Sequence, residues 1–417
     1  MARKASLLVI FLTVFIDLLG FGMVLPLLPI YGKEFARQLN LAEGHQTIGI
    51  IIGLLMSSFS IMQFLFAPLW GRLSDRVGRR PVLLVGLGGS VVFYSLFGVA
   101  TLYKSLPLLF IARIGAGIAG ATISTAQAYI ADATTLENRA RGMALIGAAF
   151  GLGFTFGPLF GYLAVPSGTG DPGPGPGYAA AALSAFALLL AWFKLPETVD
   201  PTVNRAERHW LDLTALRSAL ATPSIGPLLL ASFVCIVAFA NFESTLSLLV
   251  KDELGGFRFS FQGVCLTFAY VGFVLTLVQG GIVRRISGKV PETKVAMTGA
   301  ILEVAGFALL GFAGRWQSLP WLLVALAIVV SGFAFITPSL NSLVSRRSDP
   351  AQQGGILGVL QSIGSLARIV GPMIGIPLFQ RSSVAPLWLA AALMAVGLVL
   401  IALAGRSGRD FVATSDI

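Results

Sequence analysis

Long apolar runs recur along the whole chain, and short polar segments separate them. Each run holds about 20 residues, enough for a helix to cross a hydrocarbon core roughly 30 Å thick at a rise of 1.5 Å per residue. The runs are continuous rather than alternating, which favours helices over the strands of a membrane barrel. The predicted spans are 6–31, 46–70, 81–101, 105–131, 138–164, 177–195, 224–250, 260–283, 292–314, 319–344, 351–380 and 384–405. The pattern therefore predicts an all-α membrane protein with twelve transmembrane helices.

The longest polar stretch, 196–223, divides these spans six and six. We expect an N-terminal six-helix bundle at 1–195, a cytoplasmic central loop at 196–223 and a C-terminal six-helix bundle at 224–417. Within the loop, a weak amphipathic pattern at 210–216 predicts a short helix at the membrane interface.

The two predicted bundles have matching segments. Segment 157–161, Gly-Pro-Leu-Phe-Gly in the fifth span, is followed 214 residues later by segment 371–375, Gly-Pro-Met-Ile-Gly in the eleventh. A parallel repeat of this kind is typical of transporters whose binding site lies between two halves. Chance similarity is the alternative for matches this short. We predict two pseudo-symmetric bundles.

Composition agrees with lipid as the main solvent, because 56% of the residues are hydrophobic and 12% are charged, against about 25% charged in soluble domains. The formal net charge of +10 raises the question of a nucleic-acid partner. If the N-terminus is cytoplasmic, most of the 29 basic residues fall in inner segments, and the outer segments hold only Lys33, Arg37, Lys104, Lys251, Arg258, Arg315 and Arg381. The asymmetry follows the positive-inside rule. It predicts cytoplasmic termini, the inner (plasma) membrane and no nucleic-acid partner.

Metal, cofactor and enzyme chemistry have no candidate residues. Cys235 and Cys265 lie inside apolar spans, and His45 and His209 lie in loops on opposite sides. They cannot form a disulfide framework or a metal cluster, and no nucleophile constellation is visible. We expect no metal, no cofactor and no enzymatic activity.

The segment between the second and third spans, 71–80, reads Gly-Arg-Leu-Ser-Asp-Arg-Val-Gly-Arg-Arg. Its glycines permit a tight turn, and an acid among arginines can form ion pairs. A generic basic anchor would need neither the acid nor the glycine spacing. The segment resembles the signature loop of the major facilitator superfamily, Gly-x-Leu-(Ser/Ala)-Asp-Arg-x-Gly-Arg-Arg.

This resemblance implies a cytoplasmic gate in which Asp75 and Arg79 hold the inner side closed, Arg79 pairing with Asp132. The gate positions that it implies are Gly71, Asp75, Arg76, Gly78, Arg79, Arg80 and Asp132. The weaker second-half turn, 281–285, has no Asp at the matching place, so we expect no equal gate there.

The fifth span resembles the antiporter signature of the drug-exporting members, carried by Gly153, Gly157, Pro158 and Gly161. It departs from that signature at Ala144 and Tyr162, where the pattern has glycine. Close helix packing in lipid is the alternative explanation for these small residues.

Ionisable residues inside the spans are the candidates for proton coupling: Asp17, Glu243, Glu303, Arg113 and Arg368. Asp17 lies roughly 16 Å past the start of its helix, where an ionised carboxylate is expensive unless it meets water or a partner. Since acids outnumber bases by one, at least one carboxyl group can bind and release a proton as its surroundings change between dry and wet. A capping role for Asp17, and snorkelling or a structural hydrogen bond for Glu303, are the alternatives.

Two of these residues lie in motifs that resemble drug exporters. The pattern Asp-x2-Gly-x-Gly-x3-Pro-x2-Pro beginning at Asp17 is similar to the first helix of tetracycline exporters. Arg113 resembles the arginine of an Arg-x-x-Gln-Gly element associated with proton coupling, with Ala116 in place of the usual Gln. The third span has no acid where tetracycline exporters carry an Asp, which argues against tetracycline itself.

The sequence thus predicts a secondary transporter, with proton-coupled export of a small hydrophobic or cationic compound by alternating access. A symporter, a uniporter or a lipid flippase of the same fold is the alternative. Its expected partners are the small-molecule substrate, protons and the lipid bilayer, and we expect a monomer. Polar candidates for the substrate cavity, each also explained by helix packing, are Gln127, Asn241, Gln279, Asn341 and Gln361.

Overall fold

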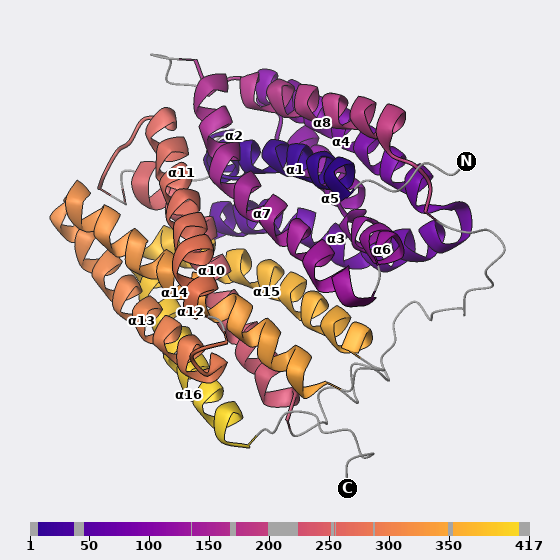
Figure 1. Cartoon of the computed structure of the whole chain (residues 1–417). Coiled ribbons are helices and arrows are strands. Elements are labelled where there is room, and N and C mark those ends of the chain that lie inside the picture. The colour runs from indigo at the N-terminus through magenta and orange to yellow at the C-terminus, as the bar shows by residue number, and fades with distance from the viewer. Residues whose placement is uncertain are drawn as a thin grey trace, which may run out of the picture. The chain divides into compact units, whose positions relative to one another are not determined.

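All regular elements that the structure describes are helices (Figure 1). This computed structural model describes residues 7–36, 46–134, 136–166, 172–198, 224–251, 254, 256–286, 288–348 and 353–407. Within them, 12 helical segments are long and apolar enough to cross a membrane, and each overlaps one predicted span. The all-α fold with twelve spans is therefore confirmed. The helix expected at 210–216 lies outside the described residues.

The chain forms two compact units, one of Met1–Leu211 with Phe259–Gly272 and one of Asp212–Arg258 with Phe273–Ile417. The first contains α1 (Leu7–Val24), α2 (Leu28–Ala36), α3 (Gln46–Val77), α4 (Arg79–Leu102), α5 (Leu106–Gly120), α6 (Ile123–Ala133), α7 (Leu136–Ala164) and α8 (Gly175–Lys194). The second contains α10 (Gly226–Lys251), η3 (Val278–Val283), α12 (Arg284–Ile286), α13 (Glu292–Trp316), α14 (Leu319–Arg347), α15 (Gln353–Arg381) and α16 (Ala385–Ser407). Helix α11 (Phe261–Leu277) is divided between them.

Several spans are not continuous α-helices. The first, Leu7–Ala36, is interrupted between α1 and α2, where Pro26 has no N–H to donate and its ring disrupts the preceding turn. The fourth is interrupted between α5 and α6, and the eighth contains the π-helical turn η3. Such irregular backbone at membrane depth is typical of binding regions in transporters.

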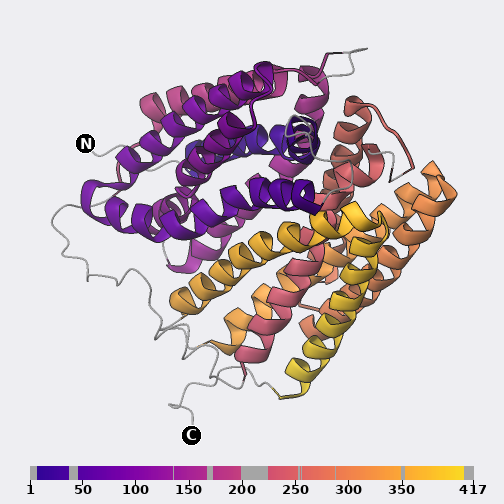
Figure 2. The ribbon, with the colours of Figure 1, turned by 180° about the vertical axis from the view of Figure 1, so that it is seen from behind.

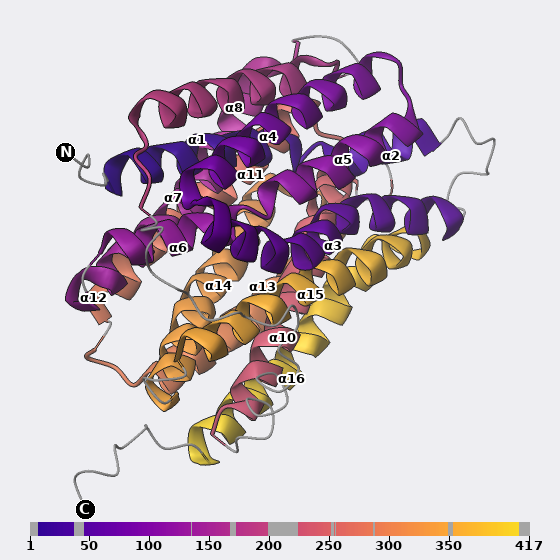
Figure 3. The same cartoon turned by 90° about the vertical axis from the view of Figure 1, so that its right-hand side faces the viewer.

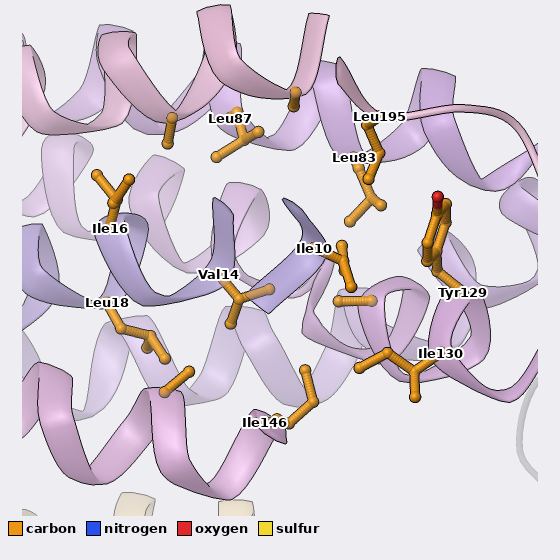
Figure 4. Close-up of a cluster of buried hydrophobic side chains, with 14 residues drawn as sticks. Ile10, Val14, Ile16, Leu18, Leu83, Leu87, Tyr129, Ile130, Ile146 and Leu195 are labelled. Atoms are coloured by element: carbon orange, nitrogen blue, oxygen red, sulfur yellow. The ribbon is translucent and has the colours of Figure 1, made fainter. Parts of the chain in front are cut away.

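Helix α1 lies at the core of the first unit, packed against α7 and α8. In Figure 4 its side chains Ile10 and Val14 lie between Leu83 and Leu87 of α4 and Ile146 of α7. Lipid tails are as apolar as these side chains, so van der Waals packing stabilises the arrangement.

Glycines set the closest helix contacts in both units. A methyl group added to Gly157 of α7 would lie 2.6 Å from the Cα of Gly22 on α1. In the second unit, a methyl group on Gly371 of α15 would lie 2.7 Å from the Cβ of Ala240 on α10. Helices α10 and α15 run side by side, as seen from the front and from behind (Figures 1 and 2). The repeated segments at 157–161 and 371–375 therefore both allow close contact with a neighbouring helix, as expected for pseudo-symmetric bundles.

We predict that Gly157→Ala lowers the free energy of unfolding by about 1–3 kcal/mol, the usual cost of overpacking, because the new methyl group meets the α1 backbone. Gly147→Ala on the same helix is the matched control, since no atom lies within 4 Å of its added methyl group. Thermal unfolding of the purified variants measures the difference. Equal midpoints for the two variants would contradict this role of Gly157.

Candidate functional site

Asp17 of α1 is held by hydroxyl groups from two neighbouring helices. The Ser184 Oγ of α8 donates a hydrogen bond of 3.0 Å to Asp17 Oδ1, and the Ser90 side chain of α4 is a second hydrogen-bond partner. Helix α8 comes this near because Gly20 faces it, a methyl group there lying 3.3 Å from the Cβ of Ala180. The carboxyl group is partly buried. Neutral hydroxyls can stabilise a carboxylate yet allow it to be protonated, which suits a reversible proton site.

Arg113 of α5 is buried, with 2% of its surface exposed. Its Nε and Nη1 have no hydrogen-bond partner among the described residues. Its guanidinium carbon lies 4.7 Å from the ring centroid of Phe59 and 5.9 Å from that of Phe21. A desolvated cation–π contact contributes about 2 kcal/mol, whereas removing an ion from water costs several kcal/mol. The rings thus offset only part of the cost of burying this charge.

The side chains of Asp17 and Arg113 do not form an ion pair in the described structure, although both belong to the first unit. Tyr94 of α4 lies within electrostatic range of both groups.

Gly117 of α5 allows α3 to come close enough for Phe59 to reach Arg113. A methyl group on Gly117 would lie 2.9 Å from the Cα of Phe59. The sequence did not single out these neighbours, since Ser, Tyr and Phe are common in membrane helices.

Glu303 of α13 is fully buried, with 0% exposure. Neither carboxyl oxygen has a hydrogen-bond partner among the described residues. Gly332 of α14 makes room for the side chain, since a methyl group there would lie 2.6 Å from Glu303 Cγ. Glu303 is therefore buried rather than snorkelling outward, and no described residue donates a hydrogen bond to it.

Glu243 and Arg368 interact electrostatically between α10 and α15. Glu243 is partly buried, whereas Arg368 is exposed. Of the three ionisable residues predicted within spans of the second unit, Glu243 and Arg368 thus form one pair of opposite charges, and Glu303 is separate from them. The five ionisable residues predicted within spans fall into separate groups, two in the first unit and three in the second.

A cluster of polar side chains, which we call the Arg79 cluster, joins the ends of α3 and α6 to the start of α4. Arg79 is 4% exposed. Its Nη2 lies 2.5 Å from Asp75 Oδ1, and its Nε donates to Asp132 Oδ2 at 3.0 Å. Its Nη1 donates to Ser74 Oγ. The Arg79–Asp132 ion pair that the resemblance implied is present, whereas Arg76 is exposed.

Glu197, which follows α8, caps the start of α4. Its carboxylate accepts from the backbone N–H groups of Arg79 at 2.9 Å and Arg80 at 3.0 Å. Acidic groups at a helix N-terminus satisfy otherwise unpaired N–H groups. Gly78 has φ of +104, and a methyl group there would collide with this carboxylate, which explains the glycine. The sequence did not identify Glu197 because it lies 118 residues from Arg79.

The second unit has an ion pair at the equivalent helix ends, with the charges exchanged. Arg346 at the end of α14 donates to Glu292 at the start of α13 at 2.9 Å, and Ser342 donates to the same carboxylate at 3.3 Å. Repeating the 214-residue spacing from Asp132 leads to Arg346, and from Arg79 to within one residue of Glu292. Turn 281–285 does not reveal this pair, because the acid lies at the start of the next helix.

The polar residues predicted for the substrate cavity have different environments. Asn241 is 1% exposed, and its Nδ2 donates to the Pro386 carbonyl at 2.7 Å, which favours a packing role. Gln127 and Gln279 are partly buried, and Asn341 and Gln361 are exposed. The described residues contain no group of three or more His, Cys, Asp or Glu that could hold a metal ion.

Comparison with known proteins agrees with this architecture. The profile of the Major Facilitator Superfamily matches residues 10–372 and 229–410. "Major facilitator superfamily domain-containing protein 10" of Bos taurus is 33% identical over 406 residues, covering 88% of this chain and 85% of that protein. "Tetracycline resistance protein, class E" of Escherichia coli is 32% identical over 365 residues, covering 87% of this chain and 84% of that protein. The crystal structure of the human organic anion transporter MFSD10 (TETRAN) matches with a TM-score of 0.71 and 30% sequence identity, and the match covers 95% of this chain and 98% of that one.

We predict that Glu197→Ala speeds hydrogen exchange at the first amides of α4, because Arg79 and Arg80 lose their acceptor. Loss of an N-terminal cap costs about 0.5–2 kcal/mol, so local exchange should accelerate up to roughly thirtyfold. Exchange monitored by mass spectrometry on peptides around 78–83 measures it. Glu34→Ala, which removes an ion pair to Lys104, is the control. Unchanged exchange in the Glu197 variant would exclude the cap.

Proposed function

Since the chain belongs to the major facilitator superfamily, we propose that this membrane transporter couples proton entry to the export of a small, largely apolar compound. The observation that carries the proposal is Asp17, a carboxyl group inside a span whose partners are the hydroxyls of Ser184 and Ser90. The named activity of the tetracycline resistance relatives supports drug export. We place the protein in the inner (plasma) membrane as a monomer with both termini cytoplasmic.

Proton binding at Asp17 follows from its surroundings. A dry environment favours the neutral carboxyl group, and water or a nearby cation favours the carboxylate. When the site faces the outer water it can take up a proton, closing the site favours keeping that proton, and opening it to the inner water releases the proton. One elementary charge crossing 100 mV releases about 2.3 kcal/mol, so one proton per cycle could sustain a substrate gradient of roughly fiftyfold.

The Arg79 cluster is suited to act as the cytoplasmic gate. Its ion pairs join three helix ends through one buried guanidinium. Removing one partner of a fully buried pair costs about 3–5 kcal/mol, and the partial exposure of Asp75 and Asp132 lowers this cost. Together the two pairs can still favour the closed inner side. The more exposed Arg346–Glu292 pair contributes less, because surface ion pairs are typically worth 0–1 kcal/mol.

Proteoliposomes with an imposed pH gradient test the coupling. We predict that Asp17→Asn abolishes transport of tetracycline-like and other aromatic test compounds driven by the gradient but retains exchange of labelled for unlabelled compound. Exchange needs substrate binding and alternating access, but no net proton movement. Glu34→Gln, at a carboxylate paired with Lys104, should leave gradient-driven transport intact. Normal gradient-driven transport by Asp17→Asn would contradict the proposed role.

Glu303 provides a separate test. We predict that Glu303→Leu raises the free energy of unfolding by about 1–3 kcal/mol, since it removes a buried polar group without a partner, and lowers proton-coupled transport. Polar groups that serve function often lower the stability of the folded protein. Thermal unfolding and proteoliposome transport of the same preparation give both quantities. A variant that is more stable and fully active would leave Glu303 without a role in coupling.

A further inference from the structure

No described residue of the first unit forms an ion pair with Arg113. Its Nε and Nη1 have no hydrogen-bond partner among the described residues, although the side chain is 2% exposed. Asp17, the acid predicted at mid-membrane in the same unit, accepts from Ser184 instead. A water molecule can accept a hydrogen bond from a guanidinium, but it cannot neutralise the charge. An anionic group can do both.

Two aromatic rings lie next to this guanidinium. Phe59 and Phe21 both contact it, with their centroids 4.9 Å apart, and Phe154 meets Phe21 edge to face at 5.9 Å. Phe59 is buried, whereas Phe21 and Phe154 are partly exposed. The accessible part of this group is therefore an aromatic surface next to unsatisfied N–H donors.

We propose that Arg113, Phe21, Phe59 and Phe154 form a binding site for an aromatic carboxylate, with the carboxylate on the guanidinium and the ring against Phe21 and Phe154. Charge-assisted hydrogen bonds to a carboxylate are about twice as strong as neutral ones, and aromatic rings favour edge or offset contacts with one another. The proposal rests on the proposed transport function and specifies its substrate class. It replaces the cationic compound expected from the sequence, because a second positive charge beside Arg113 would be repelled.

Matched pairs of acid and amide test the proposal on the purified wild-type protein. The probes are 2-naphthoate, indole-3-acetate and salicylate, each compared with its neutral carboxamide by equilibrium binding in detergent. We expect at least one acid to bind tenfold or more tightly than its amide. Equal binding within every pair, or no binding by any acid, would overturn the proposal. The comparison needs no variant, so a folding defect cannot obscure it.

Variants then assign the preference to Arg113. Arg113→Gln should remove the preference for the acid, and Arg113→Lys should retain part of it. Phe154→Leu should weaken acid and amide binding alike, and Arg406→Gln, an exposed arginine at the end of α16, should change neither. Persistence of the acid preference in Arg113→Gln would refute the site. No pH gradient is imposed, so this result is independent of proton coupling, which the Asp17→Asn experiment tests.

Discussion

The structure depends on how a few ionisable side chains are accommodated in a chain whose main solvent is lipid. Each buried charge needs a partner, and each unpartnered one is expensive. The Arg79 cluster satisfies its guanidinium fully at the ends of α3, α4 and α6. Among the described residues, by contrast, Arg113 Nε and Nη1 and both carboxyl oxygens of Glu303 have no hydrogen-bond partner. We propose that the Arg79 cluster stabilises a conformation, whereas Glu303 binds a proton and Arg113 binds a ligand.

Close helix packing makes these environments possible. In the first unit, α3 and α5 run together (Figure 3) and bring Phe59 onto Arg113. In the second unit, Gly332 lets α14 approach α13 over Glu303. The repeated Gly-Pro segments place α7 against α1 and α15 against α10 in the same manner. The two units therefore pack equivalent helices through the same small residues. At the equivalent helix ends, the first unit has Arg79 facing Asp132, and the second has Glu292 facing Arg346.

Hydropathy alone predicted the twelve spans, because a helix in lipid must be apolar over a length that the bilayer fixes. The family resemblance of segment 71–80 likewise implied the pairing of Arg79 with Asp132. The bonds of Asp17 to Ser184 and of Glu197 to the start of α4 could not be predicted, since they join residues 167 and 118 positions apart in sequence. Hydroxyl and phenyl side chains are also too common in membrane helices to be distinguished without their geometry.

The central claim is that the Asp17 carboxyl group binds and releases a proton as the protein works. Infrared difference spectroscopy on the reconstituted protein tests it directly, because a protonated carboxyl group has its own C=O stretching band. We predict that changing pH alters such a band in the wild-type protein and that this component is absent from Asp17→Asn. An identical difference spectrum in the variant would show that Asp17 does not titrate, and the account of coupling would fail.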